Sequence, residues 1–308
     1  MNIIMGDIDD RAFSNIHTAC ALGFFDGVHI GHQNLIRVLK DMAFRQNQKT
    51  VVFTFEKHPM TILNKGKAPE LITSNSEKAR IIGGLGIDIL YFTKVDEGFL
   101  NMQPEDFIND ILIKKFNVST IVTGFNFRFG KNGRGDCGFL MKFCKERNIR
   151  FKVVEPVSID GMIVSSTLIR ELIKNGNIKT ANKLLGRHYL MEGRVIHGKR
   201  RGHLLGFPTA NIDIDKGMIA PKNGVYITKT EIDGTLKAGI TNIGYNPTFG
   251  NKKISVETNI MGFDSDIYGK YIRLYFYDMI REEIKFNNIS ELKNQISHDK
   301  DIALKYSE

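Results

Sequence analysis

Residues 17–46, HTACALGFFDGVHIGHQNLIRVLKDMAFRQ, join an apolar run to an amphipathic segment through a turn that contains glycine. The run HTACALGFF is typical of a buried strand. The segment GHQNLIRVLKDMAFRQ carries its apolar residues, from Leu35 to Ala43, at the spacing of one helix face. A strand followed directly by a helix is the first half of a unit whose two strands lie parallel, so this stretch predicts an α/β domain.

The same alternation of strand and helix continues to about residue 185. Further buried strands are predicted at residues 50–55, 88–92, 118–125 and 151–157, and helices at residues 103–116 and, as two short pieces, 165–186. A chain of this kind forms a doubly wound parallel sheet that helices cover on both faces.

The pattern of predicted secondary structure changes after about Gly186. Segments rich in β-forming residues follow at residues 189–198, 224–234, 236–244, 254–262 and 270–280, and a helical pattern at residues 289–306 closes the sequence. Strands at this spacing favour a small antiparallel barrel or a sandwich, and we predict the barrel. We therefore expect an α/β domain over residues 1–185 and a β-barrel domain with a C-terminal helix over residues 186–308.

The composition sets broad limits on what the protein does. Of its 308 residues, 42% are hydrophobic and 25% charged, as in ordinary globular proteins, and the net charge is +9. The positive charge suits phosphate-bearing partners, either nucleotides or nucleic acid, but a solvated lysine-rich surface explains it equally well. Cys20, Cys137 and Cys144 are an odd number without C-x-x-C spacing, which argues against a disulfide framework or a zinc site.

Neither a membrane span nor a signal peptide is indicated. No apolar run approaches the roughly 18 residues of a spanning helix. The N-terminal stretch MNIIMGDIDDRAF is acidic and short of apolar length, unlike a signal peptide. We expect a soluble protein of a reducing compartment, the cytoplasm, without a membrane partner.

The turn FFDGVHIGH, residues 24–32, lies where the first predicted strand ends and its helix begins. Gly27 and Gly31 let phosphates approach the backbone there, and the helix N-terminus presents free N–H groups and its positive dipole end. His29 and His32 can donate hydrogen bonds to a triphosphate as charge builds on leaving pyrophosphate, which suits transfer of a nucleotidyl group. The alternative is a strand-to-helix turn with incidental histidines, against which the wider pattern G-x-F-D-G-x-H-x-G-H argues.

Three further segments fit the same pocket. In VSSTLIR, residues 164–170, two hydroxyl residues begin a helix and place Arg170 where it can grip phosphates, although alone this is only a helix cap with a surface arginine. VVFTFEKHP contributes Phe55 and His58, and TGFNFRFGKNGRGD contributes Asn126 and Arg128. Both follow predicted strands, at the sheet edge where α/β proteins bind ligands. Aromatic side chains there can stack on a planar ring or simply belong to the core.

A second candidate site lies in GRVIHGKRRGHLLGFPTANI, residues 193–212. The basic, glycine-rich loop from Gly198 to Gly202 suits phosphate, although such loops are often only solvated, and the P-loop pattern does not occur. Thr209 and Asn211 stand two apart on a β-like segment, so both face one side and offer oxygen ligands that suit Mg²⁺.

Glu257 stands in the half-apolar strand ISVETNIMGFD, residues 254–264. Alternation places Ser255, Glu257 and Asn259 on one face. A carboxylate inside a barrel mouth can act as general base on a hydroxyl, and the alternative is an outward-facing surface glutamate.

At these residues the chain resembles the bifunctional prokaryotic riboflavin kinase/FAD synthetases over essentially its whole length. The first half resembles their FMN adenylyltransferase domain, a nucleotidyltransferase, through GFFDGVHIGH, FTFEKHP, GFNFRFG and SSTLIR. The second half resembles their riboflavin kinase domain through GRVIHGKRRGHLLGFPTANI, NGVY, NIGYNPTFG and VETNI. Their order and spacing together make the resemblance specific.

The resemblance implies that ATP phosphorylates riboflavin to FMN, releasing ADP, and that a second ATP adenylylates FMN to FAD, releasing pyrophosphate. By that resemblance His29 and His32 bind ATP phosphates, Thr209 and Asn211 hold Mg²⁺ with ATP, and Glu257 deprotonates the ribityl hydroxyl. The nucleotide contacts expected in the adenylyltransferase are Gly23, Phe25, Asp26, Gly27, His29, His32, Asn126, Ser166, Thr167 and Arg170. Those expected in the kinase are Gly198, Lys199, Gly202, Gly206, Thr209 and Asn211. The flavin contacts expected are Phe55, His58, Phe207 and Glu257.

Two residues depart from the family pattern, and two alternatives stay open. Lys57 stands where the family usually has proline, and Asn126 where it usually has aspartate. One alternative is that only one domain is active. The other is a nucleic-acid-binding protein, because transfer RNA synthetases also carry the letters HIGH; the absence of a K-M-S-K-S segment argues against it, and we expect no nucleic-acid partner.

Overall fold

The computed structural model describes residues 1–306 except 7, 10–11, 64–67, 199–205 and 247–252. The chain divides into two compact units, Met1–Ser166 and Thr167–Glu308. The predicted division after residue 185 stays a prediction.

The first unit contains a sheet of six strands in the order β1-β4-β3-β2-β5-β6, and every neighbouring pair is parallel. The strands are β1 (Asn2–Met5), β2 (Thr18–Leu22), β3 (Lys49–Phe55), β4 (Ile89–Thr93), β5 (Val118–Gly124) and β6 (Arg150–Val154). The predicted doubly wound parallel sheet is therefore confirmed. The edge strand β1 was not predicted, because it has only four residues and is mostly exposed.

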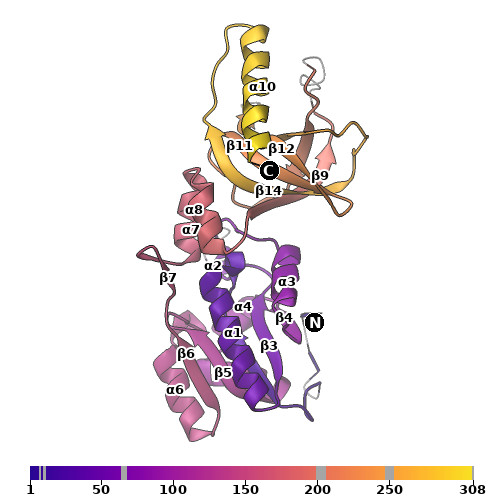
Figure 1. Cartoon of the computed structure of the whole chain (residues 1–308). Coiled ribbons are helices and arrows are strands. Elements are labelled where there is room, and N and C mark those ends of the chain that lie inside the picture. Colours follow the sequence, from indigo (N-terminus) through magenta and orange to yellow (C-terminus); the bar gives the residue numbers. More distant parts are fainter. Residues whose placement is uncertain (7, 10–11, 64–67, 199–205, 247–252, 307–308) are drawn as a thin grey trace. The chain divides into compact units, whose positions relative to one another are not determined.

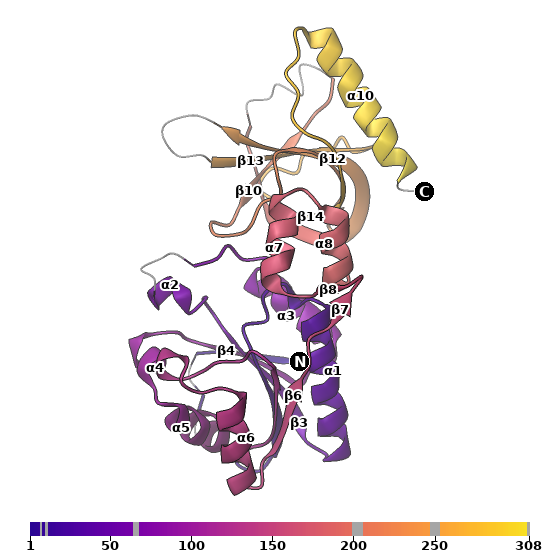
Figure 2. The same cartoon turned by 90° about the vertical axis from the view of Figure 1, so that its left-hand side faces the viewer.

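Helices cover both faces of this sheet, as Figure 2 shows for α1 on one side and α5 and α6 on the other. The helices are α1 (Ile30–Arg45), α2 (Met60–Leu63), α3 (Asn75–Gly84), α4 (Glu97–Asn101), α5 (Pro104–Asp106), the π-helical segment Phe107–Lys115 and α6 (Cys137–Glu146). Short 3₁₀ turns lie at Asp26–Val28 and Lys131–Gly133, and β7 (Ser158–Ile159) pairs with β8 (Met162–Ile163).

Successive side chains along each strand point to opposite faces of the sheet, so a hydrophobic core lies on each face. On β2, Cys20 and Leu22 face the core that Phe107 and Leu112 complete, whereas Ala21 faces the core under α1. The chain runs from β2 to β3 and β4 on one side of the sheet and returns to β5 and β6 on the other. A crevice opens at such a reversal, at the carboxyl ends of β2 and β5, and the HIGH turn follows β2 directly.

The second unit is a closed barrel in the order β10-β13-β12-β11-β14-β9, with all neighbours antiparallel (Figure 1). Its elements are α7 (Ser166–Lys174), α8 (Ile178–Leu185), β9 (Tyr189–Ile196), β10 (Ala210–Ile214), β11 (Gly224–Ile232), β12 (Thr235–Asn246), β13 (Lys253–Ile260), β14 (Tyr271–Arg281) and α10 (Ile289–Lys305). The predicted small antiparallel barrel with a C-terminal helix is confirmed.

The barrel has a packed interior and one covered outer face. Inside, the hydroxyl groups of Thr228 and Thr241 lie 2.8 Å apart, and Thr241 donates to Thr258 at 3.0 Å, so these buried polar groups are paired. Outside, Ile227 and Ile240 pack with Ala303 of α10. That outer face carries the second candidate site. Among the described residues, no helix has both the length and the apolar character needed to cross a membrane.

Candidate active sites

The turn after β2 is held in a strained conformation. Phe25 and Val28 have positive φ values of 53° and 36°, which are uncommon outside glycine and rare for a β-branched residue. The surroundings hold the turn from several sides. The buried Asp26 carboxylate accepts hydrogen bonds from the N–H groups of Ile72 and Thr73, at 3.0 and 3.2 Å, and Ser166 Oγ donates to the Asp26 carbonyl at 2.9 Å.

His29 and His32 stand together at the start of α1. The His29 Nδ1 accepts a hydrogen bond from the His32 N–H at 3.3 Å and so caps the helix. A neutral His29 therefore carries its proton on Nε2, because Nδ1 acts as the acceptor. The two rings are stacked with centroids 3.6 Å apart. This geometry joins two imidazoles to a helix N-terminus, which is a favourable place for phosphate.

A cavity of about 600 Å³ opens beside this turn. Seven predicted residues line it: Gly23, Phe25, His32, Phe55, His58, Asn126 and Arg128. The Phe24 ring lies between Phe55 and His58, with centroids at 6.2 and 4.5 Å. These aromatic side chains form one wall, which suits a planar ring system.

The other predicted residues of this site are placed differently. Asp26 and His29 are buried and are not among the residues that line the cavity, and Gly27 donates its N–H to Thr73 Oγ1 at 3.0 Å. Gly27 has φ +79°, a conformation that glycine accepts without strain. Thr167 and Arg170 belong to the second unit, so their part in this site stays a prediction.

Several residues of the first site were not predicted. Phe99, Met102 and Phe107 line the cavity from segments that carry no recognisable motif. Lys78 of α3 is enclosed behind the turn and donates from Nζ to the Phe24 carbonyl at 2.8 Å. Burial lowers the pKa of Lys78 to about 8, and the charge of Asp26 opposes that shift in part. Its position beside Ala79 and Ile82 on the buried face of α3 is the only sequence signal.

The second candidate site is a cavity of about 700 Å³ between α10 and the outer face of the barrel. Phe207, Thr209 and Glu257 line it, as do Asn242 and Asn259. Glu257 alternates with the buried Val256 and Thr258, so it lies on the face of β13 that turns toward α10. The prediction that this carboxylate lies inside the barrel mouth is wrong, because the side chains of β13 that face the barrel interior are Val256 and Thr258.

A row of polar side chains crosses three strands at Glu257. Asn211 of β10 and Asn242 of β12 both stand opposite Glu257, so the three side chains share one face. Ser255 Oγ donates to Glu257 Oε1 at 3.1 Å. The predicted grouping of Ser255 with Glu257 on one face is confirmed.

Asn211 lies tightly against Gly198. A Cβ atom on residue 198 would come within 2.1 Å of Asn211 Nδ2, so only glycine leaves room for this amide. Gly206 has φ +83° ahead of Phe207, and Thr209 lines both the large cavity and a smaller one of about 260 Å³. The predicted contacts Lys199 and Gly202 lie outside the described residues.

The outer wall of this site was not predicted. Arg281 of β14 lines the large cavity and pairs with the carboxylate of Asp299 on α10, at 2.8 Å from Nη2. Asp299 is 1% exposed and also accepts from Gln295. The ring of Phe207 lies 5.4 Å from Lys300 Nζ of the same helix. Within the described ranges, no three His, Cys, Asp or Glu side chains form a metal-binding group.

Two protein families match the chain. The family described as FAD synthetase matches residues 13–168, and the riboflavin kinase family matches residues 185–307. Several relatives are named bifunctional riboflavin kinase/FMN adenylyltransferase, among them the following three. That of Bacillus subtilis (strain 168) is 40% identical over 93% of this chain and 91% of its own. That of Buchnera aphidicola from Acyrthosiphon pisum is 37% identical over 99% of this chain and 98% of its own. That of Escherichia coli (strain K12) is 32% identical over 90% of this chain and 89% of its own.

One solved structure is also similar over nearly the whole chain. It is a crystal structure named as a macrolide-efflux protein from Streptococcus pneumoniae, with a TM-score of 0.89 and 30% identity. The match covers 98% of this chain and 99% of that one. It agrees with the α/β unit and the barrel described above.

Proposed function

Because this chain belongs to the family of bifunctional riboflavin kinases/FMN adenylyltransferases, we propose that it makes FAD from riboflavin in two ATP-dependent steps at its two cavities. The C-terminal part is the riboflavin kinase and the N-terminal part the FMN adenylyltransferase. ATP is the co-substrate of both steps.

The kinase step takes place in the cavity beneath α10. Glu257 accepts the proton of the ribityl hydroxyl, whose oxygen then bonds to the γ-phosphorus of ATP while the bond to ADP breaks. The apolar residues under α10 receive the flavin ring, with Phe207 at its edge, and ATP enters from the smaller cavity. The observation that carries this assignment is the position of Thr209, which lines both cavities and directly precedes β10, the strand that pairs with β13.

Mg²⁺ suits the oxygen ligands beside Glu257. Thr209 offers a hydroxyl and Asn211 an amide oxygen, and the amide fills the space that a Cβ on residue 198 would take. The ion supplies neutralisation of phosphate charge. Gly198 contributes a backbone contact to the phosphates, and Gly206 provides the turn before Phe207. The contacts expected of Lys199 and Gly202 stay predictions.

The adenylyltransferase step takes place at the turn before α1. An FMN phosphate oxygen bonds to the α-phosphorus of ATP, and the bond to pyrophosphate breaks. His29, His32 and the α1 N-terminus stabilise the growing negative charge, which is why no protein nucleophile is needed. Phe55 and His58 contact the FMN ring, and Gly23, Phe25 and Asn126 contact the nucleotide. Ser166 completes the phosphate contacts of this unit, and the part expected of Thr167 and Arg170 stays a prediction.

A pair of variants tests this division of labour in one chain. Glu257→Gln removes the base, so we expect FMN formation to fall by about 100-fold or more while FMN is still converted to FAD. His32→Ala removes a donor that does not cap α1, so we expect the reverse. Chromatography of the flavins after supplying riboflavin or FMN gives both rates. Equal damage to both steps by either variant would contradict the proposal.

The proposal includes neither a nucleic acid nor a membrane partner, and the cytoplasmic location stays a prediction. The nucleic-acid alternative is supported by the net charge of +9 and by the letters HIGH at residues 29–32. Binding of a short RNA at moderate salt, measured by fluorescence anisotropy, would revive that alternative.

A further inference from the structure

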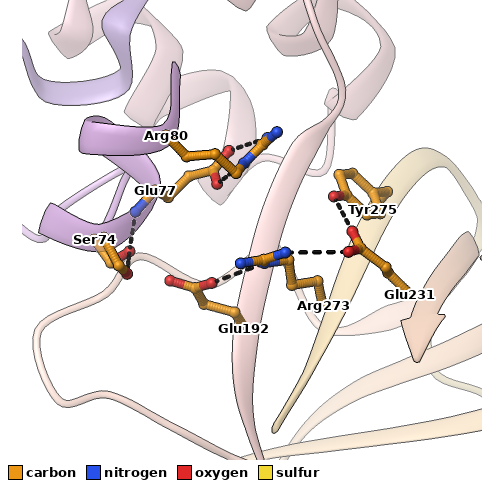
Figure 3. Close-up of polar contacts among 8 residues, drawn as sticks. Ser74, Glu77, Arg80, Glu192, Glu231, Arg273 and Tyr275 are labelled. Atoms are coloured by element: carbon orange, nitrogen blue, oxygen red, sulfur yellow. Dashed lines mark hydrogen bonds and ion pairs between the residues drawn. The ribbon is translucent and has the colours of Figure 1, made fainter. Parts of the chain in front are cut away.

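Lys78 is a buried lysine placed directly behind the first site. It is 1% exposed, and α3 fixes its position: Ser74 caps the helix, and the neighbouring Glu77 pairs with Arg80 through two hydrogen bonds of 2.7 and 2.8 Å (Figure 3). Both oxygens of the Glu77 carboxylate therefore accept hydrogen bonds from Arg80. Lys78 directs its ammonium instead to Phe24, whose ring centroid lies 4.4 Å from Nζ.

The Phe24 carbonyl has two side-chain donors. Lys78 Nζ reaches it at 2.8 Å and Thr54 Oγ1 at 2.9 Å. A carbonyl oxygen has two lone pairs, so both are engaged. A charged donor makes the stronger bond of the two.

This carbonyl decides the conformation of the ATP-binding turn. The peptide between Phe24 and Phe25 sets the φ of Phe25, which is held at 53°. Rotation of that peptide would move its oxygen away from both donors and would let Phe25 relax to an ordinary negative φ. The two donors therefore hold the strained form of the turn in place.

Phe24 also links the turn to the aromatic wall. Its ring packs at 4.5 Å on His58 and faces the cavity, while its carbonyl starts the turn that leads to His29. The contact of Lys78 with Phe24 therefore affects both the aromatic wall, where the flavin is proposed to bind, and the turn, where ATP is proposed to bind.

We propose that Lys78 is a positioning residue of the adenylyltransferase site, which fixes the ATP-binding turn and the aromatic wall through Phe24. This rests on the proposed function of that site. Lys78 takes no part in the chemical step and is not expected to touch either substrate. Methionine would fill the same space without a buried charge, so the presence of lysine is accounted for by its bond to the Phe24 carbonyl.

Lys78→Met in the full chain tests this proposal. We expect kcat for conversion of FMN to FAD to fall at least 10-fold, and KM for ATP and FMN to rise. FMN formation by the same preparation should stay within twofold of the wild-type rate, because it uses the other site. Lys40→Met is the matched control: Lys40 also donates to a backbone carbonyl, that of Leu85, at 2.6 Å, but away from the turn, and it should leave both rates unchanged.

The outcomes separate the proposals. A wild-type chain that makes no FAD overturns the proposed function of the site. A wild-type chain that makes FAD, with Lys78→Met equal to it in kcat and KM, overturns the role of Lys78. If Lys78→Met does not fold, Thr54→Val removes the second donor with little change of shape. We then expect a loss of roughly 3-fold or more in kcat/KM for FAD formation, and an unchanged value would overturn the proposal.

Discussion

Gly198 leaves no room for a side chain in the kinase site. Its backbone lies against the Asn211 amide, which stands in the polar row with Glu257 and Asn242. A side chain at residue 198 must push that amide out of the row. The row therefore depends on a residue that supplies no functional group of its own.

Gly198→Ala should consequently lower FMN formation by about 10-fold or more, because Asn211 can no longer keep its position beside Glu257. Conversion of supplied FMN to FAD should be unchanged. Gly84→Ala is the matched control, since a Cβ there meets no atom within 4 Å. If Gly198→Ala formed FMN at the wild-type rate, the position of Asn211 would not matter for the kinase step.

The buried charge of Lys78 makes stability depend on pH. Its pKa falls from 10.5 to about 8 in the folded chain, so between those values the unfolded chain binds the proton more tightly. The free energy of unfolding therefore gains about 3 kcal/mol from this group as the pH rises from below 8 to above 10.5.

Urea denaturation at a series of pH values between 7.5 and 10 would measure this gain. The wild type should gain stability relative to Lys78→Met across this range, with most of the difference above pH 8. Lys40→Met should follow the wild type. If the free energy of unfolding changed with pH in the same way for wild type and Lys78→Met, the lowered pKa of Lys78 would be contradicted.

At the level of single residues, the sequence could predict those that are neighbours along the chain. Gly23, Phe25 and His32 fall in one continuous motif, and one turn brings them to the cavity. Arg281 and Asp299 form a pair only after β14 and α10 meet, and Lys78 reaches Phe24 across 54 positions of sequence. Such contacts have no periodicity or spacing that a sequence pattern could report.

Among the elements, α10 has the clearest functional consequence. It closes the large cavity, and the pair between Arg281 and Asp299 ties it to β14 with three short contacts, of 3.1, 3.1 and 2.8 Å. Asp299 is almost fully buried, so removal of its partner leaves a charge without compensation.

Arg281→Met should therefore lower the free energy of unfolding by roughly 3–5 kcal/mol and raise KM for riboflavin, because the cavity loses its fixed wall. Lys222→Met breaks the neighbouring but exposed pair with Glu282 and should change stability by less than about 1 kcal/mol. Urea denaturation and riboflavin kinetics measure the two effects. Equal stability losses in both variants would contradict the role given to the buried pair.

The order of elements was largely predictable, and the exceptions have physical causes. Hydrophobic periodicity indicated β2 to β6 and the barrel strands β9 and β11 to β14, because each buries one or both faces. The helices α2, α3, α4 and α6 were not predicted. In α3, two charged residues, Glu77 and Lys78, occupy the buried face, which obscures the helical pattern. Residues 103–116 were expected to be one helix but form α5 followed by a π-helical segment, a change in hydrogen bonding that side-chain patterns do not reveal.

The chain as a whole holds two ATP-dependent sites because its two reactions demand different geometries. In the first reaction a hydroxyl oxygen attacks the γ-phosphorus, and in the second a phosphate oxygen attacks the α-phosphorus. The barrel offers a carboxylate at a cavity edge, whereas the parallel sheet offers a helix N-terminus and two imidazoles. The product of the barrel site is the substrate of the sheet site, which accounts for both halves of the sequence.

The most direct test of this account is a time course with purified full-length chain, riboflavin, ATP and Mg²⁺, in which the flavins are separated by chromatography. We expect FMN to appear first and to pass through a maximum while FAD accumulates. A chain that forms no FMN from riboflavin, or that forms FMN but never FAD, would contradict it.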